Sequence, residues 1–168
     1  MIVILVGPDG SGKTTLYHNL QKQLPYAIFE KGTYPGPDPE IREERKNKFK
    51  TYKRLKETVI FDRNSLIDDF VYEPLFSGND SVLAENIPEV QELLKDTKII
   101  YLDCSTAILK KRIKSRGDEF IGVEQLERIK LNYIRSFVKL DIYPYYIDTG
   151  IHDEKHVLNT VLEVIKNG

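Results

Sequence analysis

A glycine-rich segment near the amino terminus constrains the fold of this chain more than any other feature. It follows the apolar run Ile2 to Val6 and reads Gly7-Pro8-Asp9-Gly10-Ser11-Gly12-Lys13-Thr14. This spacing is the phosphate-binding P-loop pattern: glycines let several N–H groups point at one anion, the lysine adds a mobile positive charge, and the final hydroxyl can bind Mg²⁺. An apolar helical stripe follows at Leu16, Leu20 and Leu24. The segment therefore predicts a strand, a phosphate-binding loop and a helix whose positive end faces the phosphates.

The composition favours one globular domain over residues 1–168. Hydrophobic residues make up 40% and charged residues 30% of the chain, and the formal net charge is -1. Nothing in this balance points to a nucleic acid or membrane partner. Cys104 is the only cysteine, so an internal disulfide is excluded. With no secretory signal and no apolar run of membrane-spanning length, we expect a cytoplasmic protein.

Segments with strand character alternate with helical segments along the whole chain. The predicted strands are Ile2–Val6, Tyr26–Glu30, Thr58–Asp62, Lys98–Asp103 and Pro144–Asp148. The predicted helices are Lys13–Leu24, Glu40–Glu57, Leu66–Phe76, Pro88–Lys95, a helix from the N-cap Ser105 to Arg116, a long one starting near Val123, and a closing one lined by Val157, Val161, Leu162 and Ile165. This alternation predicts an α/β fold with a parallel sheet covered on both faces.

Asp62 and Arg63 stand where the third predicted strand ends. Ligands of open parallel sheets bind at the carboxyl ends of the strands, so this pair should lie beside the P-loop. A carboxylate there can hold Mg²⁺ through water, and an arginine can bind phosphate with two hydrogen bonds. The alternative is a local surface ion pair, which the P-loop makes less favourable.

Arg112 and Arg116 lie four residues apart, on one face of a helix that runs into the loop Gly117–Gly122. The transition state of phosphoryl transfer spreads negative charge over oxygens, and mobile arginines stabilise it. Three lysines on the same helix make a solvated basic face an equally good local interpretation.

Two other patterns carry weaker signals. The basic run from Arg42 to Lys56 is typical of a solvated helix face, although one or two of its members could attract an anionic acceptor. His152 and His156 have the spacing of helical metal ligands, but Asp153 stands where the zinc-protease pattern has glutamate. We therefore expect surface histidines there.

With the P-loop, the Asp62-Arg63 pair and the Arg112/Arg116 loop in this order, the chain resembles the thymidylate kinase and deoxynucleoside kinase superfamily over nearly its whole length. The resemblance implies a three-layer P-loop kinase fold with a five-stranded parallel sheet of order 2-3-1-4-5 and helices on both faces. It also implies ATP and Mg²⁺, a small-molecule nucleotide or nucleoside substrate, a lid at about residues 117–122, and a homodimer as a possible assembly.

The resemblance and the local chemistry together predict the site residues. The predicted catalytic residues are Lys13, Asp62, Arg63, Arg112 and Arg116, and the predicted Mg²⁺ ligands are Thr14 and Asp62. The predicted ATP-binding residues are Gly7, Asp9, Gly10, Ser11, Gly12, Lys13, Thr14, Thr15 and Thr149. Thr149 belongs to Asp148-Thr149-Gly150, which is similar to the loop that passes the donor adenine in this superfamily.

The two branches of the superfamily differ in the acceptor. Asp9 resembles the loop carboxylate of thymidylate kinases, which approaches the acceptor's 3′-hydroxyl. Asp68 and Tyr72 are spaced after Asp62 as in the nucleoside kinases, which usually have Glu-Arg-Ser where this chain has Asp62-Arg63-Asn64. The predicted acceptor-binding residues are Asp9, Glu30, Lys31, Arg63, Asp68, Phe70 and Tyr72, with Phe70 or Tyr72 stacking on the base.

Acceptor chemistry separates these branches. A nucleoside hydroxyl must lose a proton, so its kinase needs a general base, for which Glu30 is the candidate. A monophosphate is an anion and needs cations, which Lys31, Arg42 and Arg45 could supply. Asp9 and these basic residues favour a deoxynucleoside monophosphate, with a deoxynucleoside as the alternative.

Other classes of P-loop protein fit less well. A P-loop switch would place Asp-x-x-Gly after a strand, and no such pattern follows Asp62. A polynucleotide-end kinase would need a continuous basic groove, of which the net charge of -1 gives no sign.

Overall fold

A five-stranded parallel sheet forms the centre of the molecule. The computed structural model describes residues 1–32, 38–117 and 122–167. Its strands are β1 (Ile2–Val6), β2 (Ile28–Lys31), β3 (Val59–Asp62), β4 (Lys98–Asp103) and β5 (Tyr145–Asp148). They lie in the order β2-β3-β1-β4-β5, all parallel, which confirms the predicted sheet.

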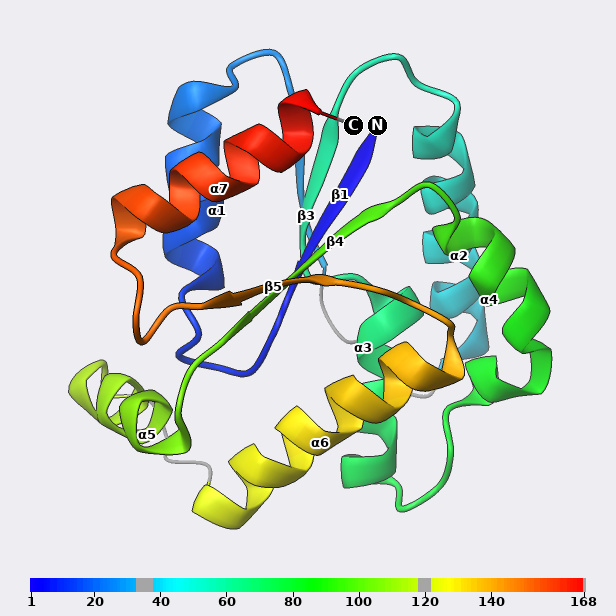
Figure 1. Ribbon diagram of the computed structural model, residues 1–168. Coiled ribbons are helices and arrows are strands. Elements are labelled where there is room, and N and C mark those ends of the chain that lie inside the picture. Colours follow the sequence, from blue (N-terminus) through cyan, green and yellow to red (C-terminus); the bar gives the residue numbers. More distant parts are fainter. Residues whose placement is uncertain (33–37, 118–121, 168) are drawn as a thin grey trace.

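Helices cover both faces of this sheet, as Figure 1 shows. One face carries α1 (Lys13–Gln23) and α7 (Glu154–Lys166). The other face carries α2 (Pro39–Lys53), α3 (Ser65–Phe76), α4 (Ile87–Leu94) and α6 (Val123–Lys139). α5 (Thr106–Ser115) lies beyond the carboxyl end of β4, and the short 3-10 helix η1 (Val82–Asn86) precedes α4.

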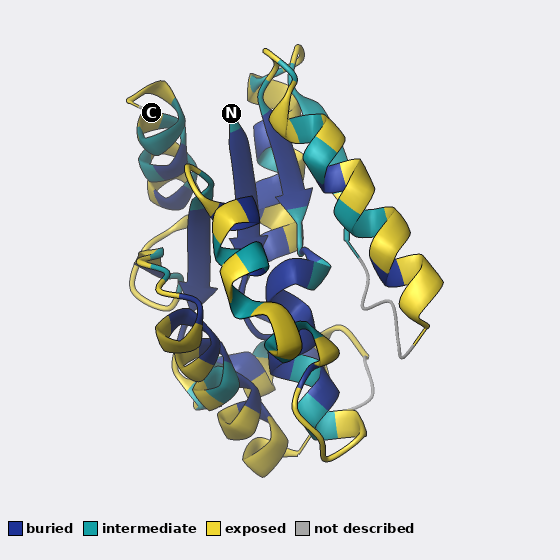
Figure 2. Ribbon diagram, turned by 90° about the vertical axis from the view of Figure 1, so that its right-hand side faces the viewer, coloured by how far each residue is buried: buried dark blue, intermediate teal, exposed yellow. Residues whose placement is uncertain are grey.

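The central strand divides the apolar core in two. Side chains alternate along a strand, so Ile2, Ile4 and Val6 of β1 pack against the layer of α2, α3, α4 and α6. Val3 and Leu5 point the other way, into the layer of α1 and α7. All five are buried, and Figure 2 shows the dark-blue strands enclosed by helices whose outer surfaces are exposed.

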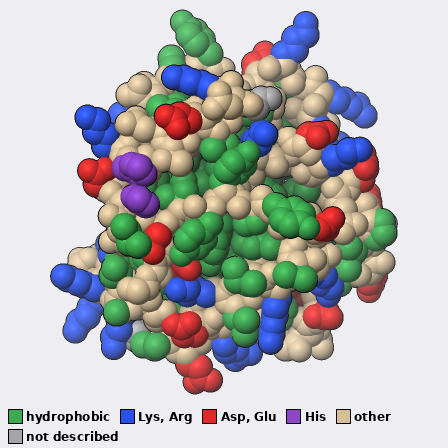
Figure 3. Space-filling view, in the orientation of Figure 1, with side chains coloured by type: hydrophobic (Ala, Val, Ile, Leu, Met, Phe, Trp, Pro, Cys, Tyr) green, Lys and Arg blue, Asp and Glu red, His purple; other side chains and the backbone are tan. Residues whose placement is uncertain are grey.

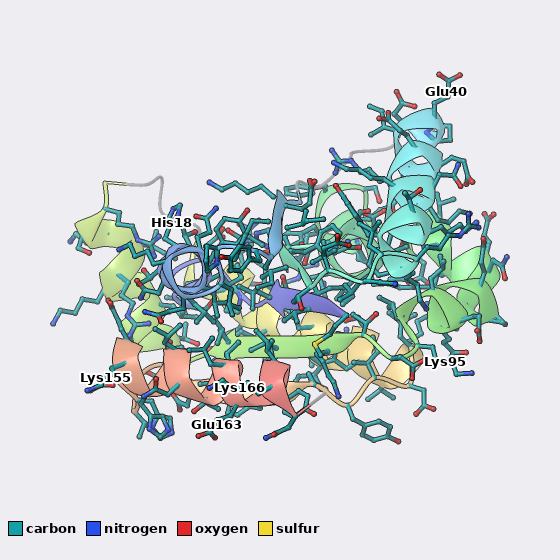
Figure 4. All side chains as sticks on the ribbon, turned by 90° about the horizontal axis from the view of Figure 1, so that it is seen from above. His18, Glu40, Lys95, Lys155, Glu163 and Lys166 are labelled. Carbon is teal, nitrogen blue, oxygen red and sulfur yellow. The ribbon has the colours of Figure 1, made fainter. Side chains whose placement is uncertain are left out.

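The carboxyl ends of the five parallel strands all lie at one edge of the sheet. Both ends of the chain lie at the opposite edge (Figure 1). Seen from that opposite edge, Glu40 on α2 and Lys155 and Glu163 on α7 point away from the sheet (Figure 4). The P-loop, Arg63 and Thr149 thus come together from three separate parts of the sequence.

Several element boundaries differ from the sequence prediction. β2 begins at Ile28 rather than Tyr26, because Tyr26 lies in the turn after Pro25 and is 92% exposed. The basic helix ends at Lys53 rather than Glu57. Lys53 donates hydrogen bonds to the carbonyls of Glu92, Leu93 and Lys95, which caps the end of α4.

Two further segments differ in how far the sequence prediction reaches. The 3-10 helix η1 was not predicted, because a turn of five residues has no long apolar period. The predicted lid falls mainly on residues 118–121, which lie outside the described residues. Within the described residues, no helix is both long enough and apolar enough to span a membrane.

Candidate active site

The P-loop is packed tightly against the neighbouring strand and loops. A Cβ atom at Gly7 would lie 2.1 Å from the carbonyl oxygen of Leu102, so the backbone can approach β4 only with glycine there. On the far side, Arg112 donates to the carbonyl of Gly10, and the hydroxyl of Thr149 donates to the carbonyl of Ser11. These contacts fix the loop from outside.

Lys13 is buried beneath the loop that precedes it. Its ammonium donates to the carbonyls of Gly7 at 2.7 Å and Pro8 at 2.8 Å, and to the hydroxyl of Ser11 at 3.3 Å. Burial, helped by the charge of Arg63, lowers the pKa of Lys13 to about 7, whereas the neighbouring carboxylates act to raise it. A bound phosphate would add negative charge that favours the ammonium form.

A polar cavity of about 220 Å³ lies next to Lys13, and we term it the transfer cavity. It is lined by Asp9, Gly10, Gly12, Lys13, Thr14, Thr15, Lys31, Gly32, Asp62, Arg63 and Arg116. Four of these side chains are cationic and two are carboxylates. The Thr14 hydroxyl and the Asp62 carboxylate are hard oxygen donors on one cavity, so the residues present fit Mg²⁺.

Arg63 is the most constrained side chain of this cavity. Its backbone has φ 71, the left-handed region, and its carbonyl oxygen lies 2.2 Å from where a Cβ of Gly32 would stand. Its guanidinium donates to Asp9 at 2.5 Å and to the hydroxyl of Tyr72 at 2.8 Å. The Tyr72 ring centroid lies 5.3 Å from the guanidinium carbon, a cation–π contact.

The two arginines of α5 have different surroundings. Arg112 is held by Thr149, donating to its hydroxyl at 2.9 Å and to its carbonyl at 2.7 Å, in addition to the bond with Gly10. Arg116 is exposed at the end of α5 and lines the transfer cavity. Arg112 therefore joins the loop after β5 to the P-loop, while Arg116 faces the site.

Two further cavities adjoin the transfer cavity. A cavity of about 550 Å³, the α1–α7 cavity, shares Gly10, Gly12, Thr14, Thr15 and Arg116 with it. The further walls of the α1–α7 cavity are Leu16, Asn19, Arg112, Ser115, Thr149, His152, Asp153, Glu154 and Val157. A cavity of about 200 Å³, the α2 cavity, shares Lys31 and Gly32 and is otherwise lined by Glu30, Glu44, Arg45, Lys48, Phe49, Phe61, Asn64 and Ser65.

Residues 3–130 match the family described as AAA domain. The chain belongs to this AAA domain family. It is 26% identical to the SPbeta prophage-derived uncharacterized protein YorR of Bacillus subtilis (strain 168) over 172 residues, which cover 98% of this chain and 99% of the relative. Its sheet order and helical layers match the P-loop kinase α/β fold.

Several solved structures share this fold. The structure of YorR in complex with phosphorylated GDP matches with a TM-score of 0.81 and 23% identity, over 99% of this chain and 96% of that chain. Deoxyadenosine kinase from M. mycoides with bound dCTP matches with a TM-score of 0.66 and 26% identity, over 100% of both chains. Shikimate kinase from Acinetobacter baumannii in complex with shikimate matches with a TM-score of 0.59 and 17% identity, over 99% of this chain and 93% of that chain.

In this AAA domain protein the predicted acceptor residues occupy three places. Asp9, Lys31 and Arg63 line the transfer cavity. Glu30 lies in the α2 cavity, where Tyr52 and Lys48 donate hydrogen bonds to its carboxylate. Burial acts to raise the pKa of Glu30, but these two hydrogen bonds outweigh it and hold the pKa below its usual value.

The remaining predicted acceptor residues lie on α3. Asp68 is 2% exposed and accepts a hydrogen bond from the hydroxyl of Tyr133. Phe70 is buried in the core, where the ammonium of Lys139 lies 5.8 Å from its ring centroid. Phe70 packs into the core, and the Tyr72 ring lies against Arg63. The aromatic residues that line the α2 cavity are Phe49 and Phe61.

The histidine pair lies at the start of α7. The rings of His152 and His156 stack with centroids 4.2 Å apart, and Figure 3 shows two histidine side chains together on the surface there. Among the described residues, no group of three or more histidine, cysteine, aspartate or glutamate side chains could hold a metal ion. Thus the pair has no metal site around it in the described part of the chain.

Sequence reasoning missed Tyr133 and Tyr52. Tyr133 continues the apolar stripe of α6 with Leu126 and Ile129, so its spacing indicated a core residue and gave no sign of its hydroxyl's partners. Tyr52 lies within the basic run, where charge dominated the interpretation.

Proposed function

We propose that this protein transfers a phosphoryl group from ATP to a deoxynucleoside monophosphate, with thymidylate as the first acceptor to test. The observation that carries the proposal is the charge of the transfer cavity, with four cationic side chains against two carboxylates. One carboxylate, Asp9, already pairs with Arg63. An acceptor phosphate facing the donor phosphates needs such an excess of cations, whereas a neutral hydroxyl does not.

The arrangement of the three adjoining cavities supports a binding place for each of the two substrates. The α1–α7 cavity adjoins the P-loop and would take the donor nucleoside, as expected from Thr149. The transfer cavity would take the phosphates, and the α2 cavity would take the acceptor nucleoside against Phe49 and Phe61. On this proposal residues 1–168 form one kinase domain, with a lid at about 117–122.

Each predicted residue then has a chemical task. Lys13 and the P-loop would bind the donor phosphates, and Thr14 and Asp62 would hold Mg²⁺, which supplies positive charge to the phosphate oxygens. Lys31 and Arg63 would bind the acceptor phosphate. Arg116 would stabilise the charge that develops on the transferred group, because it lines both the α1–α7 cavity and the transfer cavity.

A deoxynucleoside kinase is the second candidate, and Glu30 is the observation that favours it. Its carboxylate lines the α2 cavity, where it could accept the proton of a sugar hydroxyl. The likeness to deoxyadenosine kinase from M. mycoides points the same way.

A substrate panel with a Glu30 variant separates the two candidates. ATP and Mg²⁺ are supplied with each deoxynucleoside, each deoxynucleoside monophosphate, and a 5′-hydroxyl oligonucleotide. We expect turnover of a monophosphate, and a pH–rate profile whose acid limb is unchanged in Glu30→Gln. Glu43→Gln, an exposed α2 carboxylate paired with Lys46, is the matched control.

The opposite pattern would replace the proposal. A general base contributes about 10²–10⁴-fold, so a nucleoside kinase should lose that much rate in Glu30→Gln. Such a loss, with phosphorylation of deoxynucleosides and of no monophosphate, would establish the second candidate.

A further inference from the structure

The hydroxyl of Tyr133 lies at a junction of four segments. Tyr133 comes from the middle of α6 and is fully buried. Its oxygen is 2.8 Å from Oδ1 of Asp68 on α3, 3.3 Å from the carbonyl oxygen of Gly7 in the P-loop, and 3.4 Å from Nη1 of Arg63 after β3. The same hydroxyl thus touches the P-loop and the arginine of the transfer cavity.

The distances indicate which bond the hydroxyl makes. A phenol carries one proton, so it can donate fully to only one acceptor. The shortest contact is to the carboxylate of Asp68, which is also the stronger of the two acceptors, because the guanidinium of Arg63 can only donate. Tyr133 therefore donates to Asp68 and leaves its lone pairs toward Arg63.

Asp68 is a buried carboxylate that needs a partner. Burial raises its pKa, while the charge of Arg63 and the hydrogen bond from Tyr133 act to lower it. Its Oδ2 lies 3.9 Å from Nη1 of Arg63, farther than a direct hydrogen bond. Without the Tyr133 hydroxyl, the nearest strong donor for Asp68 would be Arg63.

We propose that Tyr133 is a positioning residue: by binding Asp68, its hydroxyl keeps Arg63 turned toward Asp9 and the transfer cavity, where it can reach an acceptor phosphate. This inference rests on the proposed function in its last step only. The geometric step, competition between Tyr133 and Arg63 for Asp68, holds for any acceptor.

Tyr101 provides a matched control for a buried phenol. It belongs to the same aromatic cluster, with its ring centroid 5.4 Å from that of Tyr133, and it is 2% exposed. Its hydroxyl partner is Asp103, outside the transfer cavity. Tyr101→Phe removes a buried hydroxyl of the same kind, so it reports the effect of that loss on stability alone.

The test combines a structure with a rescue experiment. In a crystal structure of Tyr133→Phe, the Arg63–Asp68 distance should close from 3.9 Å to about 3 Å, the length of a charged hydrogen bond. In kinetics, Tyr133→Phe should lower kcat/KM for the monophosphate about tenfold, with ATP affinity unchanged. Tyr101→Phe should stay within about twofold of the parent.

Removing the charge of Asp68 should restore the function of Arg63. In an Asp68→Asn background, Tyr133→Phe should cost less than about twofold, because no carboxylate remains to draw Arg63 away. An equal loss in both backgrounds, or an Arg63 that stays in place in the Tyr133→Phe structure, would overturn the proposal. If the parent phosphorylates no monophosphate, the proposed function has failed, and the Arg63–Asp68 distance in the variant still decides the role of Tyr133.

Discussion

Two arginines, the half-buried Arg63 and the buried Arg42, each lie close to two carboxylates and contact α3 through different residues. Arg63 pairs with Asp9 and approaches Asp68, and tyrosine hydroxyls complete its surroundings. Arg42 of α2 pairs with Asp69 at 3.3 Å and with Glu73 at 2.9 Å. Asp68 and Asp69 are adjacent in sequence and nearly equally buried, yet Asp68 faces Tyr133 and Arg63, whereas Asp69 faces Arg42 of α2.

The difference between the two clusters is how their carboxylates are satisfied. Asp68 accepts a hydrogen bond from a neutral hydroxyl, which leaves Arg63 available to a ligand. Neither oxygen of Asp69 accepts a hydrogen bond from a described residue, and its partner is the charge of Arg42. On the proposed function the first cluster would bind a ligand, whereas the second joins α2 to α3 and buries charge.

The largest expected effect is a loss of activity when Arg63 is removed and a loss of stability when Arg42 is removed. Arg63→Ala should lower kcat/KM about 10²–10³-fold, because a group aimed at the reacting phosphates is removed. Arg42→Ala should leave kcat/KM within tenfold but lower the free energy of unfolding by about 3–5 kcal/mol, because it strands buried carboxylates. Kinetics and urea unfolding of both variants measure this. Equal losses of activity would remove the distinction between the clusters.

A smaller effect is expected when the whole α2–α3 cluster becomes apolar. Buried ion pairs cost desolvation energy, so the triple variant Arg42→Met, Asp69→Leu, Glu73→Leu should match the parent or gain about 1–4 kcal/mol of stability. Its kcat/KM should stay close to that of the parent. A loss of acceptor turnover with the stability intact would show that the cluster shapes the substrate site.

The smallest effect is a change in the pH dependence of stability at Asp69. Burial raises its pKa to about 7, although the charge of Arg42 opposes this. Between about pH 4 and pH 7 the folded state then holds a proton that the unfolded state has lost, so stability falls as pH rises. Asp69→Asn should reduce that slope by up to about 1.4 kcal/mol per pH unit. Unfolding at several pH values measures the slope, and an unchanged slope would mean that Asp69 is ionised throughout.

The sequence predicted the frame of the site because its chemistry is local. The strand, loop and helix around Lys13 depend on residues within one short segment, and the structure places them there. The Asp62-Arg63 pair was located because parallel strands end at a common edge. The sheet order needed the family resemblance, since residue patterns do not state which strands are neighbours.

The side-chain positions that the sequence could not predict depend on helix rotation and on distant partners. Phe70 and Tyr72 are two positions apart on α3, so one packs into the core while the other reaches Arg63. Most of the basic run around Arg42 was interpreted as a solvated face, yet Arg42 is 8% exposed. Its partner Glu73 lies 31 residues farther along the chain, and no local sequence pattern predicts that contact.

The close approach of Gly32 to Arg63 affects how substrate preference could evolve. Gly32 borders both the transfer cavity and the α2 cavity, and any side chain on it would strike the Arg63 backbone. The wall between the phosphate and nucleoside parts of the proposed acceptor site is therefore closed to change. Variation in acceptor preference is directed instead to the α2 wall, where Lys48 and its neighbours can be exchanged without moving Arg63.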